Sequence, residues 1–272
     1  MVTESVTYGE RKGLSKKESY LLSYLAENRK NIFGLKDVEK VLNCNYESAK
    51  VAVSRLVKKG WVERIGKGKY LIIPLSAGTK SEYSEHEFII ASLFEGYIGY
   101  WSALNYYGFS EQIPNKIFIA SPKRLRDRII FGIKYKFVYL SAGKFFGFQE
   151  FRLSGFKIRI SDKEKTIVDC LDKPKYSGGI EEIAKALYLA RDELDFDKMV
   201  KYSLRMNNNA IIKRLGFLLD LLGFEEEKRL RRFIGKSYAI LDPSKPKKGE
   251  FNSKWRLVVN VNEKQLSKMV KC

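Results

Sequence analysis

Apolar side chains recur at helical spacing in two segments near the start of the chain. Ser15 and Glu18 precede the first segment in the pattern of a capping box, in which each side chain accepts a hydrogen bond from a backbone N–H at the helix start. A second, shorter helix is predicted to begin near Gly34 and to end at Asn43. The inward-facing positions of the two predicted helices are Leu21, Leu22, Leu25, Leu35, Val38 and Leu42.

A third helix is predicted over residues 46–59, with Asn45 as its N-cap. Its apolar face consists of Ala49, Ala52, Val53 and Leu56, which helical spacing places together against the first two helices. The opposite face is polar and basic, which suits a helix that contacts base edges and phosphates in the major groove. The alternative is that the face is polar only because it is exposed to solvent. The candidate DNA-contacting residues are Tyr46, Glu47, Ser48, Lys50, Ser54, Arg55 and Lys58.

Two short apolar-rich strands, 61–65 and 70–73, are predicted around the basic, glycine-rich turn at residues 66–69. Three helices followed by such a hairpin resemble the winged helix-turn-helix family over residues 14–74. In that family the hairpin is a wing that approaches phosphate or the minor groove, whereas many hairpin tips are only polar and solvated. The candidate wing contacts are Arg64, Lys67 and Lys69.

Residues 74–81 are small and polar, which predicts a domain boundary. We therefore expect a DNA-binding domain at 1–75, a linker at 76–82 and a second domain at 83–272. Strands are predicted at 116–120, 134–140, 150–153, 156–160 and 255–259, with a hairpin turn at Ser154-Gly155. Helices are predicted mainly after residue 161, where residues 161–164 read as another capping box. The expected fold class is α+β, with a winged helix-turn-helix before a larger mixed α/β domain that has a mainly antiparallel sheet and C-terminal helices.

Three segments of the second domain resemble AbiEi-type antitoxins: residues 100–109 (YWSALNYYGF), 161–172 (SDKEKTIVDCLD, with Gly178-Gly179 after it) and 214–219 (RLGFLL). The resemblance implies that the N-terminal domain binds inverted repeats in its own promoter and represses the operon. It also implies that the AbiEi-like C-terminal domain, 83–272, counters a nucleotidyltransferase-like toxin in a type IV pair, without a stable complex being required. A stand-alone regulator is the alternative.

The 51 basic and 32 acidic residues give a formal net charge of +19, which favours nucleic acid, an anionic membrane or an acidic protein as a partner. A basic run follows Ser121-Pro122 in a predicted loop-to-helix segment, and Lys245, Lys247 and Lys248 lie in a proline-containing loop. Such residues usually form solvated faces, but a second surface for RNA or for the toxin's nucleic-acid substrate is possible. The candidates for that second basic surface are Lys123, Arg124, Arg126 and Arg128.

We expect no enzymatic activity, metal or cofactor. His86 is the one histidine, so any Ser-His-Asp or Cys-His catalytic arrangement would have to include it. The three cysteines include no CxxC pair. A divalent metal would need acidic ligands, for which the candidates are Asp162, Glu164, Asp169 and Asp172, but helix capping and turns explain these residues more simply.

No apolar run approaches the ~20 residues that span a bilayer, and residues 1–11 lack the apolar core of a signal peptide, so the expected location is the cytoplasm. Double-stranded DNA is the expected partner. The alternative from another class is an RNA- or protein-interacting factor in which the winged helix is only a scaffold.

Overall fold

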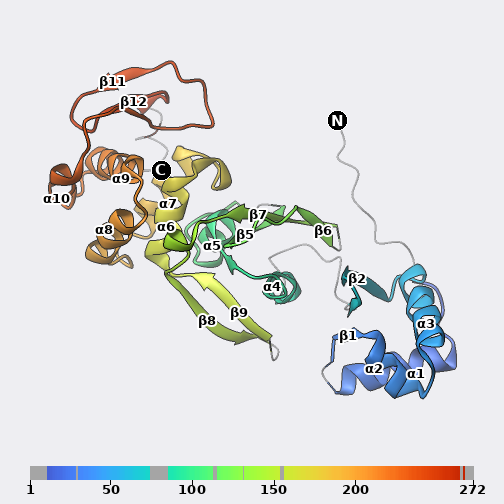
Figure 1. Ribbon diagram of the computed structural model, residues 1–272. Coiled ribbons are helices and arrows are strands. Elements are labelled where there is room, and N and C mark those ends of the chain that lie inside the picture. The colour runs from blue at the N-terminus through green and yellow to red at the C-terminus, as the bar shows by residue number, and fades with distance from the viewer. Residues whose placement is uncertain are drawn as a thin grey trace. The chain divides into compact units, whose positions relative to one another are not determined.

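The computed structural model describes residues 11–28, 30–73, 85–112, 115–130, 132–153, 156–263 and 266 (Figure 1). The chain divides into two compact units, Met1–Glu82 with Ile129–Ile133, and Tyr83–Arg128 with Lys134–Cys272. The predicted linker at 76–82 and the predicted turn at Ser154-Gly155 lie outside the described residues.

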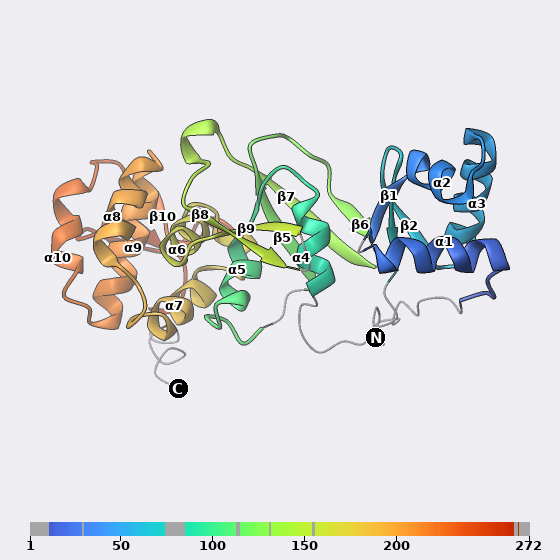
Figure 2. The same ribbon diagram turned by 90° about the horizontal axis from the view of Figure 1, so that it is seen from below.

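The first unit has the element order helix, strand, helix, helix, strand, strand, so it contains the three predicted helices and the predicted hairpin together with one further strand (Figure 2). Its strands form one antiparallel sheet in the order β1-β3-β2. The elements are α1 (Lys16–Glu27), β1 (Ile32–Gly34), α2 (Leu35–Leu42), α3 (Tyr46–Lys58), β2 (Val62–Gly66) and β3 (Lys69–Ile72).

Local caps fix where the helices of the first unit begin. The backbone N–H of Ser15 donates to Glu18 at 2.7 Å, and the N–H of Glu18 donates back to the Ser15 hydroxyl, so the predicted capping box is confirmed. The Asn45 side chain accepts from the N–H of Ser48 at 2.9 Å and starts α3 as predicted. The apolar faces then close over one core, which contains Leu21, Leu25, Phe33, Val38, Ala49, Val53 and Leu56.

A six-stranded sheet in the order β6-β7-β5-β4-β9-β8 forms one part of the second unit, except that the division of the chain assigns Ile129–Ile133, which includes most of β6, to the first unit. The α+β fold class is confirmed. Antiparallel pairs (β4 with β5, β8 with β9) alternate with parallel pairs (β5 with β7, β4 with β9), and the parallel pairs join strands that are distant in sequence. The strands are β4 (Tyr97–Ile98), β5 (Lys116–Ser121), β6 (Arg128–Ile130), β7 (Ile133–Tyr139), β8 (Phe148–Leu153) and β9 (Phe156–Ser161).

Two helices pack on this sheet: α4 (Glu85–Ser92) contacts β9, and α5 (Tyr100–Tyr106) contacts β5 (Figure 2). The helix predicted after Ser121-Pro122 is wrong, because the chain there runs as a loop into β6. Asp127 explains the difference. Its carboxylate accepts from the backbone N–H of Phe137 and from the Lys136 ammonium, which ties the loop to β7 instead of leaving it free to coil.

The remaining helices surround α6 (Lys163–Asp172), which contacts α5, α7, α8 and α9 and is buried from Glu164 to Asp172. The N-cap of α6 is Asp162, which accepts from the N–H of Lys165, and not Ser161 as the sequence suggested. Ser161 instead hydrogen-bonds the hydroxyl of Thr166. The other elements are η2 (Pro174–Tyr176), α7 (Ile180–Leu189), α8 (Phe196–Arg205), α9 (Asn209–Leu222), α10 (Glu227–Leu230) and η3 (Arg231–Phe233).

A small sheet in the order β10-β12-β11 completes the second unit, and β11 and β12 lie beside α9 in Figure 1. Its strands are β10 (Ala239–Ile240), β11 (Glu250–Asn252) and β12 (Leu257–Val259), of which only β12 falls in a predicted strand. Within the described residues, no helix combines the length and the apolar character needed to cross a lipid bilayer.

Candidate nucleic-acid interface

The exposed side of α3 carries all seven predicted DNA-contacting residues. Ala49, Val53 and Leu56 are buried and hold the helix on its unit, while Ala52 is half-buried. Because the inward face is narrow and apolar, the polar residues share the outward face for the length of the helix. The structure brings the seven together, as the sequence predicted, on one continuous surface.

The charged side chains on this surface form few and weak ion pairs with the described residues. Lys50 lies 3.7 Å from Glu47 in a pair whose members are 59% and 73% exposed, and such pairs contribute little. Arg55 and Lys58 make no ion pair with any residue that the structure describes. Lys59 is different, because its ammonium lies 2.6 Å from the buried Glu18 carboxylate and serves the core of the unit. The exposed cations of α3, Lys50, Arg55 and Lys58, therefore remain available to an anionic ligand.

The β2–β3 hairpin follows α3 in the chain and ends in a short turn. The pairing register shifts between Arg64 and Gly66, and Gly68 adopts a φ of 68°, which a residue with a side chain rarely accepts. The Arg64 guanidinium folds back to donate to the Gly66 carbonyl at 3.3 Å. The side chains of Lys67 and Lys69 are exposed and make no hydrogen bond or ion pair with the described part of the chain. Two of the three predicted wing residues thus present unpaired ammonium groups.

Residues that the sequence did not single out hold the base of this hairpin. The Trp61 indole donates to the Lys12 carbonyl at 2.8 Å, and the Arg11 guanidinium stacks on that indole at 4.8 Å. Phe33 of β1 stacks on Tyr70 of β3 with ring centroids 5.9 Å apart. These contacts fix the hairpin to the segment before α1 and to β1, and their sequence separation explains why no local pattern revealed them.

The predicted second basic surface is largely occupied by contacts within the second unit. Lys123 forms an ion pair with Glu95 at 2.5 Å. Arg124 stacks on Tyr139 at 4.4 Å, and Arg128 lies 5.5 Å from the Phe94 ring centroid. Arg126 is exposed. Binding of nucleic acid through Lys123, Arg124, Arg126 and Arg128 stays a prediction.

The four carboxylates considered for a metal site are each engaged by other groups. Asp162 accepts from the Tyr202 hydroxyl, Glu164 pairs with Lys198 and Asp172 pairs with Lys144. Asp169 is fully buried against Lys165. Among the described residues, no group of three histidine, cysteine or acidic side chains is placed to hold a metal ion. The contacts of these four carboxylates lie within the second unit.

The segments that resemble AbiEi-type antitoxins also pack the interior of the second unit. The Trp101 indole donates to Ser110, and Tyr107 donates to the Ser161 carbonyl. The buried Arg214 guanidinium donates to the Leu171 carbonyl at the end of α6, and burial lowers its pKa to about 10. The resemblance thus falls on residues that hold the central helices together.

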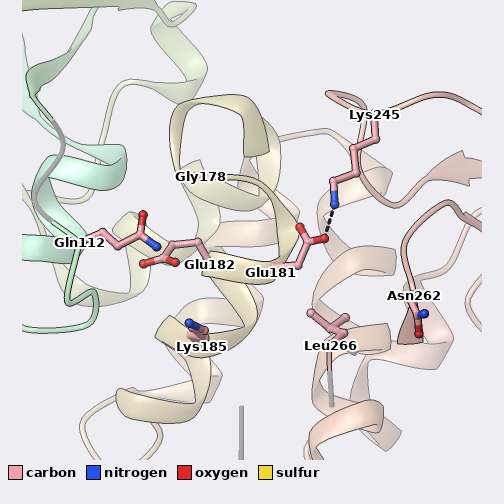
Figure 3. A pocket seen from close by; sticks show the side chains of 8 residues that line it. All are labelled: Gln112, Gly178, Glu181, Glu182, Lys185, Lys245, Asn262 and Leu266. Atoms are coloured by element: carbon pink, nitrogen blue, oxygen red, sulfur yellow. Dashed lines mark hydrogen bonds and ion pairs between the residues drawn. The ribbon is translucent and has the colours of Figure 1, made fainter. Parts of the chain in front are cut away.

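A cavity of about 310 Å³ opens beside α7 (Figure 3). Its two acidic groups are already satisfied, because Glu181 is paired with Lys245 and Glu182 accepts from the Ser110 hydroxyl. Lys185 is the remaining charged group in the lining, so the cavity lacks a convergent set of free polar groups. The lining residues are Gln112, Gly178, Glu181, Glu182, Lys185, Lys245, Asn262 and Leu266.

Comparison with known proteins agrees with the first unit as the candidate interface. Residues 20–73 match the model of a family described as "Transcriptional regulator, AbiEi antitoxin". The whole chain is similar to the crystal structure of the RV2827C protein from Mycobacterium tuberculosis, with a TM-score of 0.71 and 17% identity over 97% of this chain and 98% of that chain. At that identity the likeness shows the fold alone.

No curated protein sequence matches the chain. The family match covers most of α1 and all of α2, α3 and the hairpin, and a family of transcriptional regulators implies DNA as a ligand. The resemblance to AbiEi antitoxins is therefore confirmed for residues 20–73, which match the model of this family of transcriptional regulators.

Proposed function

We propose that the first unit is a winged helix-turn-helix that binds double-stranded DNA with α3 in the major groove and the β2–β3 hairpin on the phosphate backbone. The observation that carries this proposal is the single exposed face of α3, which gathers Lys50, Arg55 and Lys58 with the polar side chains of Ser48 and Ser54. Cations would bind phosphates and the short polar groups would meet base edges. The family match supports this assignment.

The biological role that we propose is autorepression in the cytoplasm. The resemblance to AbiEi-type antitoxins supports an inverted repeat in the promoter of the chain's own operon as the operator. Two copies would then bind one repeat, because the symmetry of the DNA site mirrors that of the protein copies. A footprint that protects two half-sites about one helical turn, or a multiple of it, apart would support this arrangement, and a single protected half-site would contradict it.

The same resemblance leads us to propose that the protein counters a nucleotidyltransferase-like toxin without having to form a stable complex with it. Co-expression tests this directly: the full chain should restore growth of cells that express such a toxin from the neighbouring gene. Growth arrest that persists at full expression of the chain would favour a stand-alone regulator.

The wing makes a prediction about salt dependence. Replacing Lys67 and Lys69 together with alanine should weaken binding to any duplex and lower the slope of log affinity against log salt by about 2, since each neutralised phosphate contributes ~0.9. A salt titration of duplex binding measures this slope. The control is the exposed pair Lys175 and Lys201 in the second unit, whose replacement should leave the slope unchanged. An unaltered slope in the Lys67→Ala, Lys69→Ala variant would remove the wing from the interface.

The α3 surface makes a prediction about specificity. Ser54→Ala should reduce the preference for the operator over a random duplex by about 1 kcal/mol or more, because a lost base contact removes discrimination and leaves phosphate binding in place. Competition with unlabelled random duplex gives the ratio of affinities. Ser23→Ala, at an exposed position of α1, is the matched control. A ratio that is equal in both variants would show that Ser54 reads no base.

A further inference from the structure

The small sheet of the second unit has one buried face and one open face. Leu257 and Val259 of β12 are buried, whereas side chains one residue out of phase with them point outward. In register across the three strands, Ile240, Val258 and Phe251 lie in one row on this open face. We call the open face the outer sheet surface, defined by Tyr238, Ile240, Phe251, Arg256 and Val258.

Two aromatic rings stand exposed on the outer sheet surface. Phe251 is 73% exposed and Tyr238 is 44% exposed. Their ring centroids are 5.3 Å apart and their planes cross at 81°, so the pair spans the middle strand, β12, from the strands on either side. Burial of a phenylalanine ring contributes to the free energy of folding, and a ring this exposed gives up most of that contribution. The exposure of Phe251 therefore does not by itself stabilise the fold.

Unpaired cations flank the rings. Residues 236–256 contain six basic residues, of which Lys245 and Lys254 are ion-paired, and two acidic residues, the fully buried Asp242 and the exposed Glu250. Lys236, Lys247 and Lys248 are exposed and form no ion pair with the part of the chain that the structure describes. The Arg256 guanidinium donates to the Lys236 carbonyl at 3.1 Å, which fixes it beside the rings. The outer sheet surface is therefore both aromatic and strongly positive.

The sheet that carries these groups is firmly supported. Trp255, fully buried, packs against Gly216 of α9 and donates from its indole to Asp220 at 2.9 Å. A Cβ at Gly249 would lie 2.1 Å from the Val259 carbonyl, so the chain after Lys248 runs directly against β12. The lysine pair is thereby held within four residues of Phe251 at the edge of the outer sheet surface.

We propose that the outer sheet surface binds single-stranded nucleic acid, with unpaired bases stacked on Phe251 and Tyr238 and the phosphates between Lys236, Lys247, Lys248 and Arg256. Exposed rings on a positive sheet suit unpaired bases, whose faces are free, and do not suit a duplex, whose bases stack on each other. A protein partner fits less well, because lysine is depleted at protein–protein interfaces and here surrounds the rings. This site is separate from the DNA-binding surface proposed for the first unit.

Fluorescence anisotropy of a labelled short oligouridine RNA, and of the thymidine DNA of the same length, tests the proposal with the full chain. Unlabelled duplex DNA in excess occupies the first unit. Phe251→Ala and Phe251→Leu should each weaken single-strand binding about fivefold or more, while Phe251→Trp should bind at least as tightly as the original, because stacking needs an aromatic ring. Equal affinity of the original protein for RNA and DNA would indicate stacking and phosphate contacts alone, and tighter binding of RNA would add recognition of the 2′-hydroxyl.

Variants that remove lysine charges test the proposal independently of Phe251. Lys247→Gln with Lys248→Gln should lower the salt slope of single-strand binding by about 0.7 per lost phosphate contact, whereas Lys175→Gln with Lys201→Gln should leave it unchanged. The proposal is overturned if Phe251→Leu keeps the original affinity, which would indicate an apolar protein-docking site. It is also overturned if the two pairs of lysine variants behave alike, because the general positive charge of the chain would then be responsible for binding.

Discussion

Asp169→Ala should destabilise the second unit by about 3–5 kcal/mol, because it leaves a buried ammonium without its partner. Lys165 and Asp169 are both fully buried and form an ion pair one helical turn apart on α6. The Tyr97 hydroxyl donates to Asp169 at 2.7 Å and lies 3.1 Å from the Lys165 ammonium. Burial raises the pKa of Asp169, and burial also raises the pKa of Tyr97 far above its usual value, so the hydroxyl keeps its proton and donates it.

Urea unfolding of the two proteins measures this loss, provided that the slope against urea is unchanged. The informative control is Lys165→Met combined with Asp169→Asn, which removes both charges and keeps an acceptor for Tyr97. This double variant should recover most of the stability, since replacing a buried pair with neutral groups often costs little. If the double variant is as unstable as Asp169→Ala, the missing carboxylate matters for packing and not for charge.

Gly216→Ala should destabilise the second unit by roughly 2 kcal/mol, although a glycine-to-alanine change inside a helix ordinarily stabilises by about 1 kcal/mol. The reversal comes from Trp255, because a Cβ at Gly216 would lie 1.9 Å from its ring. The ring is fully buried and cannot move away. The indole N–H of Trp255 donates a hydrogen bond to Asp220, and its backbone N–H donates to the Asn252 side chain. The methyl group must therefore displace the helix or the small sheet.

Thermal unfolding compares this variant with Gly143→Ala, where a Cβ would meet no atom within 4 Å. The control should leave the melting temperature nearly unchanged, and Gly216→Ala combined with Trp255→Phe should recover part of the loss. A melting temperature for Gly216→Ala at or above that of the original protein would contradict the close packing of α9 against Trp255.

The sequence predicted the first unit well because local interactions determine its elements. Ser15 and Asn45 mark helix starts by side-chain caps that span only three residues, and the apolar faces follow helical spacing. Strand β1 was not predicted, since three residues carry too little pattern and its pairing with β3 is distant in sequence. The exposed positions of α3 followed from the same periodicity, whereas contact of these residues with DNA stays a prediction.

The second unit was less predictable because distant contacts decide its details. The burial of Lys165 and Asp169 was not predicted, because contacts from outside their helix, including those with Tyr97 and Phe146, enclose them. The basic run at 123–128 suggested a helix, but Asp127 ties it to β7. The outer sheet surface depends on β10 and β11, which are two and three residues long and gave no periodic signal.

The most direct test of DNA recognition by the first unit is a salt-titrated gel shift of the full chain on the DNA upstream of its own gene, against a random duplex of equal length. We expect tighter, two-step binding to the upstream DNA, a steep salt dependence for both duplexes, and loss of the preference when the exposed face of α3 is altered. Equal, salt-sensitive affinity for the two duplexes would contradict this expectation, because the charge of the chain would then explain all of the binding.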